Sequence, residues 1–310
     1  MNPTVRRNVT CWLLLILCSC LSVVAQDAAV APQPIAIDGA QSRVYKSVDG
    51  GELRLHIFNP PNRVTVPAVP AIVFFFGGGW TGGTVTQFAP QSNHLARRGM
   101  TAIVADYRVF GRHKTGAFEA IADAKSAIRW VRAHATELGI DPARIAAGGG
   151  SSGGHIALAA AVLEGFDELN ENRSVSSKPS ALVLFNPAVD TTSENGARIG
   201  GTVRDTLGAR FGDRGRDGSP IHHLSPRLPP TIVLHGKADT TVPYADVERF
   251  CSEMTKFGND CQLVGYDGAT HGFFNPRNDD GKWYRATLLE ADRFLTQIGY
   301  LKGPVPTQIP

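Results

Sequence analysis

The sequence has no excess of charge of either sign. It contains 31 lysine and arginine residues against 28 aspartate and glutamate residues, and charged residues make up only 19% of the chain. It also has no basic stripe and no cluster in which basic and aromatic residues are interleaved, the pattern expected of a nucleic-acid-binding surface. The composition therefore gives no reason to expect a nucleic-acid partner.

A spacing of residues that would predict a metal site is also missing. The histidines considered as ligands are His222, His223 and His235, and no cysteine or carboxylate spacing accompanies them. His235 fits better at the end of a strand. We therefore expect no metal ion.

Only one hydrophobic run invites a membrane interpretation, and it lies near the N-terminus. Residues 11–24 are too few to favour a stable membrane span. Two arginines precede the run and small residues end it at Ala25, as in a secretory signal peptide. We predict that residues 1–25 are removed and that the mature protein begins near Gln26, without a membrane span, in a secreted or periplasmic location. An uncleaved anchor is the less favoured alternative.

Cysteine is scarce, with five in the whole chain. Cys11, Cys18 and Cys20 leave with the signal peptide, and no small-residue lipobox precedes Cys18 or Cys20 to favour a lipoprotein. Cys251 and Cys261 remain, in what should be an oxidising compartment. We predict a disulfide between them that joins a helix to the next strand, closes a short loop and contributes about 2–3 kcal/mol of stability in the chain-entropy model.

No internal repeat or low-complexity linker divides the rest of the chain, so we predict one domain over residues 41–300. Residues 26–40 are expected to form a flexible leader and residues 301–310 a flexible tail. Strand-like runs lie near residues 52–58, 71–76, 101–105, 144–148, 181–185, 231–235 and 261–266, and helical patterns near 117–138, 152–163, 244–257 and 283–298. This alternation predicts an α/β fold, with a mostly parallel sheet covered by helices on both faces.

One heptapeptide carries most of the predicted chemistry. Gly149-Gly150-Ser151-Ser152-Gly153-Gly154-His155 follows a strand-like run and opens a helical pattern. A serine on such a sharp strand-to-helix turn is typical of a nucleophile elbow, and glycines must flank it because the turn leaves no room for side chains. The pattern therefore predicts a serine hydrolase.

The pattern G-x-S-x-G fits the heptapeptide in two registers, so two serines compete. We choose Ser151, because Gly153 and Gly154 then occupy the crowded start of the helix, whereas Ser152 as nucleophile would put His155 on a crowded position. A phosphate-binding loop is disfavoured because no Lys-Ser or Lys-Thr pair follows. A dinucleotide site is disfavoured because the third spaced glycine is missing.

Glycines also follow the apolar run 71–76, in Phe76-Gly77-Gly78-Gly79-Trp80. We predict that the backbone N–H groups of Gly78 and Gly79, with that of Ser152, form an oxyanion hole. A plain strand-ending turn is the alternative, but three consecutive glycines cost more conformational entropy than such a turn requires.

The order nucleophile, acid, histidine nominates the partners of the serine. His271 is the only histidine after the acid-bearing region, and it lies in a glycine-bounded loop after the run 261–266. Asp239 follows a buried run by a short turn and would fix the imidazole tautomer. Asp190 is the competitor from the preceding strand, while Asp267 is more typical of turn chemistry.

Taken together, these motifs resemble the α/β-hydrolase esterase/lipase superfamily over about residues 45–298. The other shared motifs are Asp106-Tyr107-Arg108, Asp141-Pro142-Ala143-Arg144-Ile145, His235-Gly236-Lys237-Ala238-Asp239 and His271-Gly272-Phe273. Within the superfamily the chain is similar to acetylxylan-esterase-like and feruloyl-esterase-like carboxylesterases. The resemblance implies a triad of Ser151, Asp239 and His271, and no cofactor.

Two positions depart from the pattern of the relatives. Phe76 stands where many of them carry a histidine before the oxyanion glycines, which leaves the support of that loop to other residues. Gly150 replaces the aspartate of the hormone-sensitive-lipase elbow, which argues against that subgroup.

The polar, glycine-rich stretch of residues 191–230 is the expected cap over the substrate. Trp80, Phe211, His222 and His223 are the predicted substrate contacts, although packing against the body is an equal alternative for the last three. A short, polar cap favours an open cleft.

The sequence therefore predicts a secreted carboxylesterase for short acyl esters, such as acetyl or feruloyl groups on carbohydrate. A serine amidase or peptidase with the same triad, and an inactive binding protein on the same fold, are the alternatives.

Overall fold

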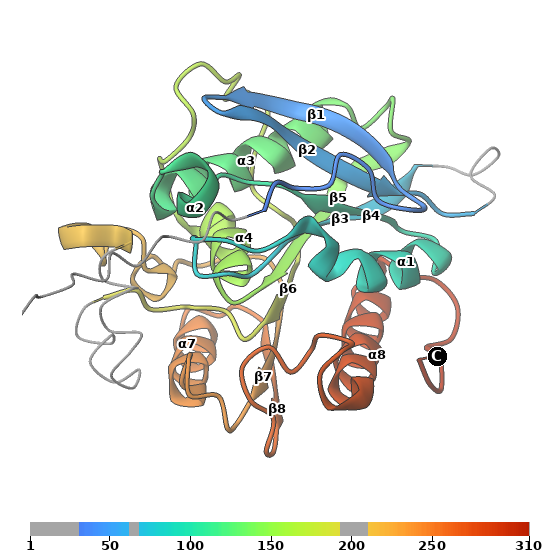
Figure 1. Ribbon diagram of the computed structural model, residues 1–310. Helices are drawn as coiled ribbons and strands as arrows, with labels where there is room; N and C mark the ends of the chain where they lie inside the picture. Colours follow the sequence, from blue (N-terminus) through green and yellow to red (C-terminus); the bar gives the residue numbers. More distant parts are fainter. Residues whose placement is uncertain (1–30, 62–67, 193–209, 310) are drawn as a thin grey trace, which may run out of the picture.

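A single twisted sheet runs through the protein, as the computed structural model of residues 31–61, 68–192 and 210–309 shows (Figure 1). Its eight strands lie in the order β1-β2-β4-β3-β5-β6-β7-β8. Their bounds are Gln41–Val48 (β1), Gly51–Phe58 (β2), Val69–Phe75 (β3), Thr101–Ala105 (β4), Ile140–Gly150 (β5), Leu182–Phe185 (β6), Thr231–Gly236 (β7) and Cys261–Tyr266 (β8).

Six neighbouring strands, β4, β3, β5, β6, β7 and β8, pair in parallel. Strands β1 and β2 form an antiparallel hairpin, and β2 also pairs antiparallel with β4. The mostly parallel sheet predicted from the sequence is therefore confirmed. Each of the seven predicted runs corresponds to a strand. Strand β1 was not predicted, because its side chains are exposed or half-buried and carry little apolar signal.

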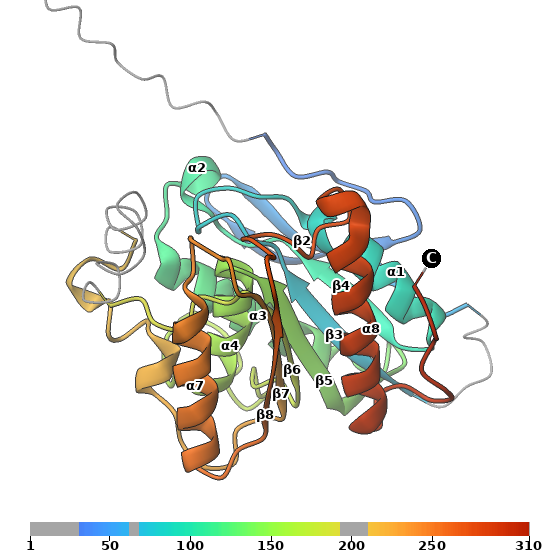
Figure 2. The same cartoon turned by 90° about the horizontal axis from the view of Figure 1, so that it is seen from below.

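Helices cover both faces of the sheet (Figure 2). Helices α1 (Ala89–Arg97) and α8 (Lys282–Gln297) lie on one face, and α3 (Ala117–Ala133), α4 (Ser152–Val162) and α7 (Tyr244–Lys256) on the other. Helix α3 ends earlier than the predicted 117–138, because the chain turns at His134 and returns to the sheet as β5. Helices α1 and α2 (Phe110–His113) were not predicted.

The predicted disulfide is present between Cys251 on α7 and Cys261 at the start of β8, with 5.3 Å between the two Cα atoms. It joins the helix and the strand that precede the loop of His271. Among the described residues, no helix has the length and apolar character needed to cross a membrane.

The predicted signal peptide and most of the predicted cap, residues 193–209, lie outside the described residues. In the described part of the leader, the side chain of Gln33 donates a hydrogen bond to the Gly83 carbonyl and accepts one from the Val85 amide. In the tail, Ile309 is buried.

Candidate active site

Ser151 lies on the sharp turn between β5 and α4. Its backbone has φ 53° and ψ −120°, a conformation that residues other than glycine seldom adopt. The amide of Ser151 donates to the Phe185 carbonyl of the neighbouring strand β6 at 2.9 Å, which fixes the turn to the sheet. Strain of this kind persists only where surrounding structure enforces it, and it concentrates at functional sites.

The glycines beside Ser151 allow this turn to lie against strand β3. A Cβ atom on Gly153 would lie 2.1 Å from the Phe75 carbonyl oxygen, and one on Gly149 would lie 2.5 Å from the same oxygen. In both cases the obstacle is a backbone oxygen of a central strand, which cannot move aside. The glycine pattern that reveals the elbow in the sequence is therefore a packing requirement.

The structure brings Ser151, His271 and Asp239 into one hydrogen-bonded chain. His271 Nε2 lies 3.0 Å from Ser151 Oγ, and His271 Nδ1 lies 2.7 Å from Asp239 Oδ2. The competing serine, Ser152, is buried and its hydroxyl is not bonded to His271. The geometry therefore favours the register with Ser151 as nucleophile.

Asp239 is held as a carboxylate by its surroundings. Its Oδ1 accepts hydrogen bonds from the amides of Thr241 (2.8 Å) and Val242 (2.9 Å), while Oδ2 lies 3.3 Å from Nε2 of the buried His235. Burial by itself would raise the pKa of Asp239, but the hydrogen bonds from His235 and His271 outweigh it and hold the pKa well below its ordinary value. A charged carboxylate at this place can orient and stabilise a protonated His271.

The two other acids considered from the sequence lie elsewhere. Asp190 accepts hydrogen bonds from Thr192 and Ser219 and pairs with Arg249. Asp267 pairs with Lys237 at the surface. Neither contacts His271, so the structure assigns them to local packing and turn chemistry.

The loop after β3 presents free backbone amides beside Ser151. Gly78 and Gly79 have φ of 142° and 60°, and a Cβ atom on Gly78 would lie 2.3 Å from the Gly82 carbonyl oxygen. Among the described residues, the amides of Gly78, Gly79 and Ser152 donate no hydrogen bond. Donors left open in this way can bind a developing oxyanion without giving up another partner.

Phe76, in the place of the usual histidine, is supported by packing. Its ring stacks on Tyr107 at 4.2 Å between centroids, and the Tyr107 hydroxyl donates to the Phe76 carbonyl at 2.7 Å. The amide of Gly77 donates to Gln87 Oε1 at 2.7 Å. The Gly83 carbonyl at the end of the loop accepts hydrogen bonds from Gln33 and from Arg112. These contacts hold the loop that a histidine would otherwise support.

A cavity of about 490 Å³ opens over Ser151 and His271. Trp80 lines it as predicted, but Phe211, His222 and His223 do not. Phe211 is buried and packs edge-on against Trp80 behind the cavity wall. His222 lies near Asp190, and His223 Nε2 bonds to the Arg216 carbonyl. None of these three side chains lines the described cavity, which agrees with the alternative that they pack against the body, and their contact with substrate stays a prediction.

Several residues of the cavity wall were not predicted. They are Gln87, Asn186, Arg210, Thr241, Val242, Phe274 and Asn275. Thr241 and Val242 could have been found, because they follow Asp239 in the turn that binds its carboxylate. The sequence gives no signal for Asn186, which follows β6 with φ 34°. Its backbone amide donates to the Leu234 carbonyl, but its buried side-chain amide group has no hydrogen-bond partner among the described residues.

Across residues 31–61, 68–192 and 210–309, no three His, Cys, Asp or Glu side chains are grouped as a metal ion would require. Ser151 and His271 line the cavity, and Asp239 is bonded to the other ring nitrogen of His271. A hydroxyl, a base and an acid in this order are suited to nucleophilic catalysis.

A serine on a sharp turn at the end of a parallel strand, bonded to a histidine, is typical of the α/β-hydrolase class. Similarity to known proteins places this chain among the ester-hydrolysing enzymes of that class. A BD-FAE family model matches residues 55–254, and the chain belongs to that family. A Dienelactone hydrolase family model also matches residues 216–298.

Among solved structures, the apo form of Thermogutta terrifontis esterase 2 is 44% identical, with a TM-score of 0.81, over 87% of this chain and 98% of that chain. Two esterases of Mycobacterium tuberculosis are more distant. The probable carboxylic ester hydrolase LipM is 31% identical over 64% of this chain and 48% of its own length. Esterase LipC is 29% identical over 74% of this chain and 59% of its own. The chain thus spans about half to three-fifths of these two relatives.

Proposed function

We propose that the protein hydrolyses short-chain acyl esters through a covalent acyl-enzyme on Ser151, and that its natural substrates carry acetyl or feruloyl groups on carbohydrate. The observation that carries this proposal is the hydrogen-bonded chain from Ser151 through His271 to Asp239 at the mouth of a cavity.

In the proposed reaction, His271 Nε2 takes the proton of Ser151 as Oγ attacks the ester carbonyl carbon. The amides of Gly78, Gly79 and Ser152 stabilise the oxyanion. The intermediate collapses, and the leaving alcohol takes its proton from His271. Water, deprotonated by the same imidazole, then attacks the acyl-enzyme and releases the carboxylic acid. Losing one oxyanion donor typically costs about 3–4 kcal/mol of transition-state stabilisation.

The preference for short acyl chains has two supports. The cavity is modest, at about 490 Å³, and Phe274 and Trp80 contribute bulky walls. Solved structures of Thermogutta terrifontis esterase 2 are described with propionate and with butyrate bound. Acids of three and four carbons therefore guide the choice of test substrates, and acetate is the next shorter acid.

The test is hydrolysis of p-nitrophenyl acetate, butyrate and decanoate by residues 26–310, beside the Ser151→Ala and Ser152→Ala variants. We expect turnover of the two shorter esters that disappears only in Ser151→Ala. Activity that persists in Ser151→Ala would contradict the nucleophile, and faster turnover of decanoate than of acetate would contradict the short-chain preference. Turnover of p-nitroacetanilide but not of the esters would favour an amidase, and no turnover at all would favour an inactive binding protein.

The carbohydrate assignment needs its own comparison. Acetylated and feruloylated xylo-oligosaccharides, matched to p-nitrophenyl acetate in acyl concentration, should be deacylated with a higher kcat/KM than simple alkyl esters. Equal or slower release from the sugars would contradict this part of the proposal.

We also propose that residues 1–25 are cleaved and that the mature protein acts outside the cytoplasm. The Cys251–Cys261 disulfide supports this, because disulfides persist in oxidising compartments. N-terminal sequencing of protein recovered from the medium or periplasm should start near Gln26, and an intact Met1 in the cytosolic fraction would contradict the proposal.

A further inference from the structure

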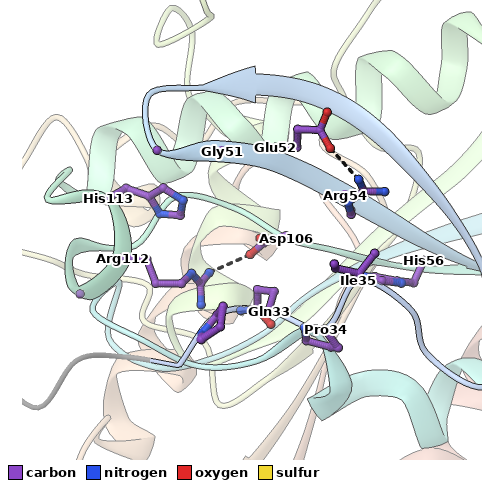
Figure 3. Close-up of a pocket in the computed structure, with 13 residues that line it drawn as sticks. Gln33, Pro34, Ile35, Gly51, Glu52, Arg54, His56, Asp106, Arg112 and His113 are labelled. Carbon is purple, nitrogen blue, oxygen red and sulfur yellow. Dashed lines mark hydrogen bonds and ion pairs between the residues drawn. The ribbon is translucent and has the colours of Figure 1, made fainter.

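A second cavity, of about 620 Å³, lies apart from Ser151 and His271 (Figure 3). It is walled by strand β2, by the end of β4, by helix α2 and by the segment of residues 32–35. Its volume falls within the range of about 300–1,000 Å³ that is typical of small-molecule sites. None of its lining residues belongs to the catalytic cavity.

The charges on its wall neutralise one another. Arg112 pairs with Asp106 at 2.8 Å, and Arg54 pairs with Glu52 at 2.5 Å, as the dashed lines of Figure 3 show. The wall therefore holds two positive and two negative side chains in two pairs. An ionic ligand would have to compete with one of these pairs, whereas a neutral ligand would leave both intact.

Buried polar atoms on the same wall lack partners. His56 is fully buried, and neither of its ring nitrogens has a hydrogen bond among the described residues; Arg112 Nε is in the same situation. Burial, and then the charge of Arg54, lower the pKa of His56, so its ring is neutral and offers one donor and one acceptor. Unsatisfied buried groups are uncommon because each costs free energy, and they call for an explanation.

The outer wall is apolar. Pro32, Pro34 and Ile35 line this side, and Ile35 lies next to His56 in the view of Figure 3. The side chain of Ile35 is 72% exposed, so it gives up little packing if a ligand moves it to reach the imidazole. The cavity thus combines a polar floor with an apolar side.

We propose that this cavity is a non-catalytic binding site for a neutral sugar. Each sugar hydroxyl both donates and accepts, which matches the neutral ring of His56 and the acceptor oxygens of Asp106. Arg54 and Arg112, which also line the cavity, supply further N–H donors while their ion pairs stay intact. The C–H face of the ring matches the wall of Pro34 and Ile35. The zero net charge of the wall gives an anion or a cation no comparable advantage.

The site also contacts the loop that carries the oxyanion glycines. Gln33 and Arg112, both on its wall, donate to the Gly83 carbonyl, and Gly83 lies directly against Gly77. Binding in the second cavity is nevertheless a separate property. It can be measured whether or not the protein hydrolyses esters, so the proposal does not rest on the proposed function.

The test is calorimetric titration of residues 26–310 with the neutral sugars xylotriose and cellotriose, and with phosphate and acetate as ionic probes. We expect at least one trisaccharide to bind. The variants His56→Phe and Arg54→Met should each raise its Kd at least tenfold, whereas Arg43→Met on the neighbouring strand β1 should leave it unchanged. His56→Phe keeps a planar aromatic ring at this position and removes two unsatisfied nitrogens, so its thermal unfolding temperature should equal or exceed that of the parent.

Each other outcome overturns the proposal. Absence of binding by either trisaccharide would show that the cavity is not a sugar site. Binding that survives both His56→Phe and Arg54→Met would place the sugar elsewhere. Tighter binding of phosphate or acetate than of the trisaccharides would show an ion site. If His56→Phe unfolds, Arg54→Met, at a position whose side chain is 29% exposed, still decides between these results.

Discussion

We predict that burial of His155 alone makes the protein lose about 3 kcal/mol of its free energy of unfolding as the pH falls from 6.5 to 4. The ring of His155 is fully buried on α4, edge-on to Trp80 at 5.0 Å, and its Nε2 bonds to the Gly218 carbonyl at 2.7 Å. Burial lowers its pKa from 6.5 to about 4, against the smaller opposing effect of the Gly218 carbonyl.

The sign follows from the protons that each state binds. Between pH 6.5 and 4 the unfolded chain protonates His155 while the native protein does not, so stability is fully present above pH 6.5 and falls as the pH drops. Each pH unit in this window corresponds to about 1.4 kcal/mol, which gives the total of about 3 kcal/mol.

Asp106 acts in the opposite direction and must be separated from His155. Burial raises its pKa from 3.8 to about 6, despite the charge of Arg112, so the native protein binds the extra proton between these values and gains stability as the pH falls. The pH profile of the unmodified protein therefore does not isolate the effect of His155, since burial also lowers the pKa of His56 and adds to the loss of stability as the pH falls. A comparison with a variant cancels the contribution of Asp106, which both proteins share.

The assay is urea unfolding of the unmodified protein and of His155→Gln at several pH values between 7 and 4. Glutamine does not titrate, and its amide can still donate to the Gly218 carbonyl. At pH 7 the variant should be less stable because it loses the packing of the ring against Trp80. We expect this difference to shrink by about 3 kcal/mol by pH 4. A difference that stays constant within about 0.5 kcal/mol across the range would refute the reasoning.

Three further predictions concern the elbow, the acid and the disulfide. Gly153→Ala should abolish folded protein, because the new Cβ would meet a backbone oxygen at 2.1 Å, while Gly165→Ala, at an open loop position with φ 78°, should cost only about 1–2 kcal/mol; equal soluble yield and melting temperature for both variants would contradict this. Asp239→Asn should lower kcat on p-nitrophenyl acetate by about 10³–10⁴-fold with its circular dichroism spectrum unchanged, since the imidazolium loses its partner. A loss smaller than tenfold would assign the acid's role to another residue. Replacing Cys251 and Cys261 together by serine should lower the free energy of unfolding by about 2–3 kcal/mol in denaturant titrations. An unchanged midpoint, or two free thiols in the unreduced protein, would exclude a stabilising disulfide.

The sequence alone was sufficient for features that depend on local pattern. Glycines around Ser151 reveal the elbow because a Cβ atom at Gly149 or Gly153 would strike the backbone of β3. Apolar runs reveal seven of the eight strands because a parallel sheet buries both its faces. Chain order nominates Asp239 and His271, and the structure bonds His271 to Ser151 and Asp239 to His271.

Only the tertiary structure decided what depends on side chains from distant segments. Strand β1 carries little apolar signal, so its pairing with β2 becomes visible only in the folded sheet. Phe211 is an aromatic residue of the kind that contacts a substrate, but it packs against Trp80. The direction in which a cap side chain points is set by its neighbours in the folded protein. Gln33 and Arg112 hold the loop after β3 by hydrogen bonds to the Gly83 carbonyl. They lie 50 and 29 positions away from Gly83 in the sequence. Such contacts leave no periodic trace in the sequence, since they depend on how the elements pack and not on the repeat of any one of them.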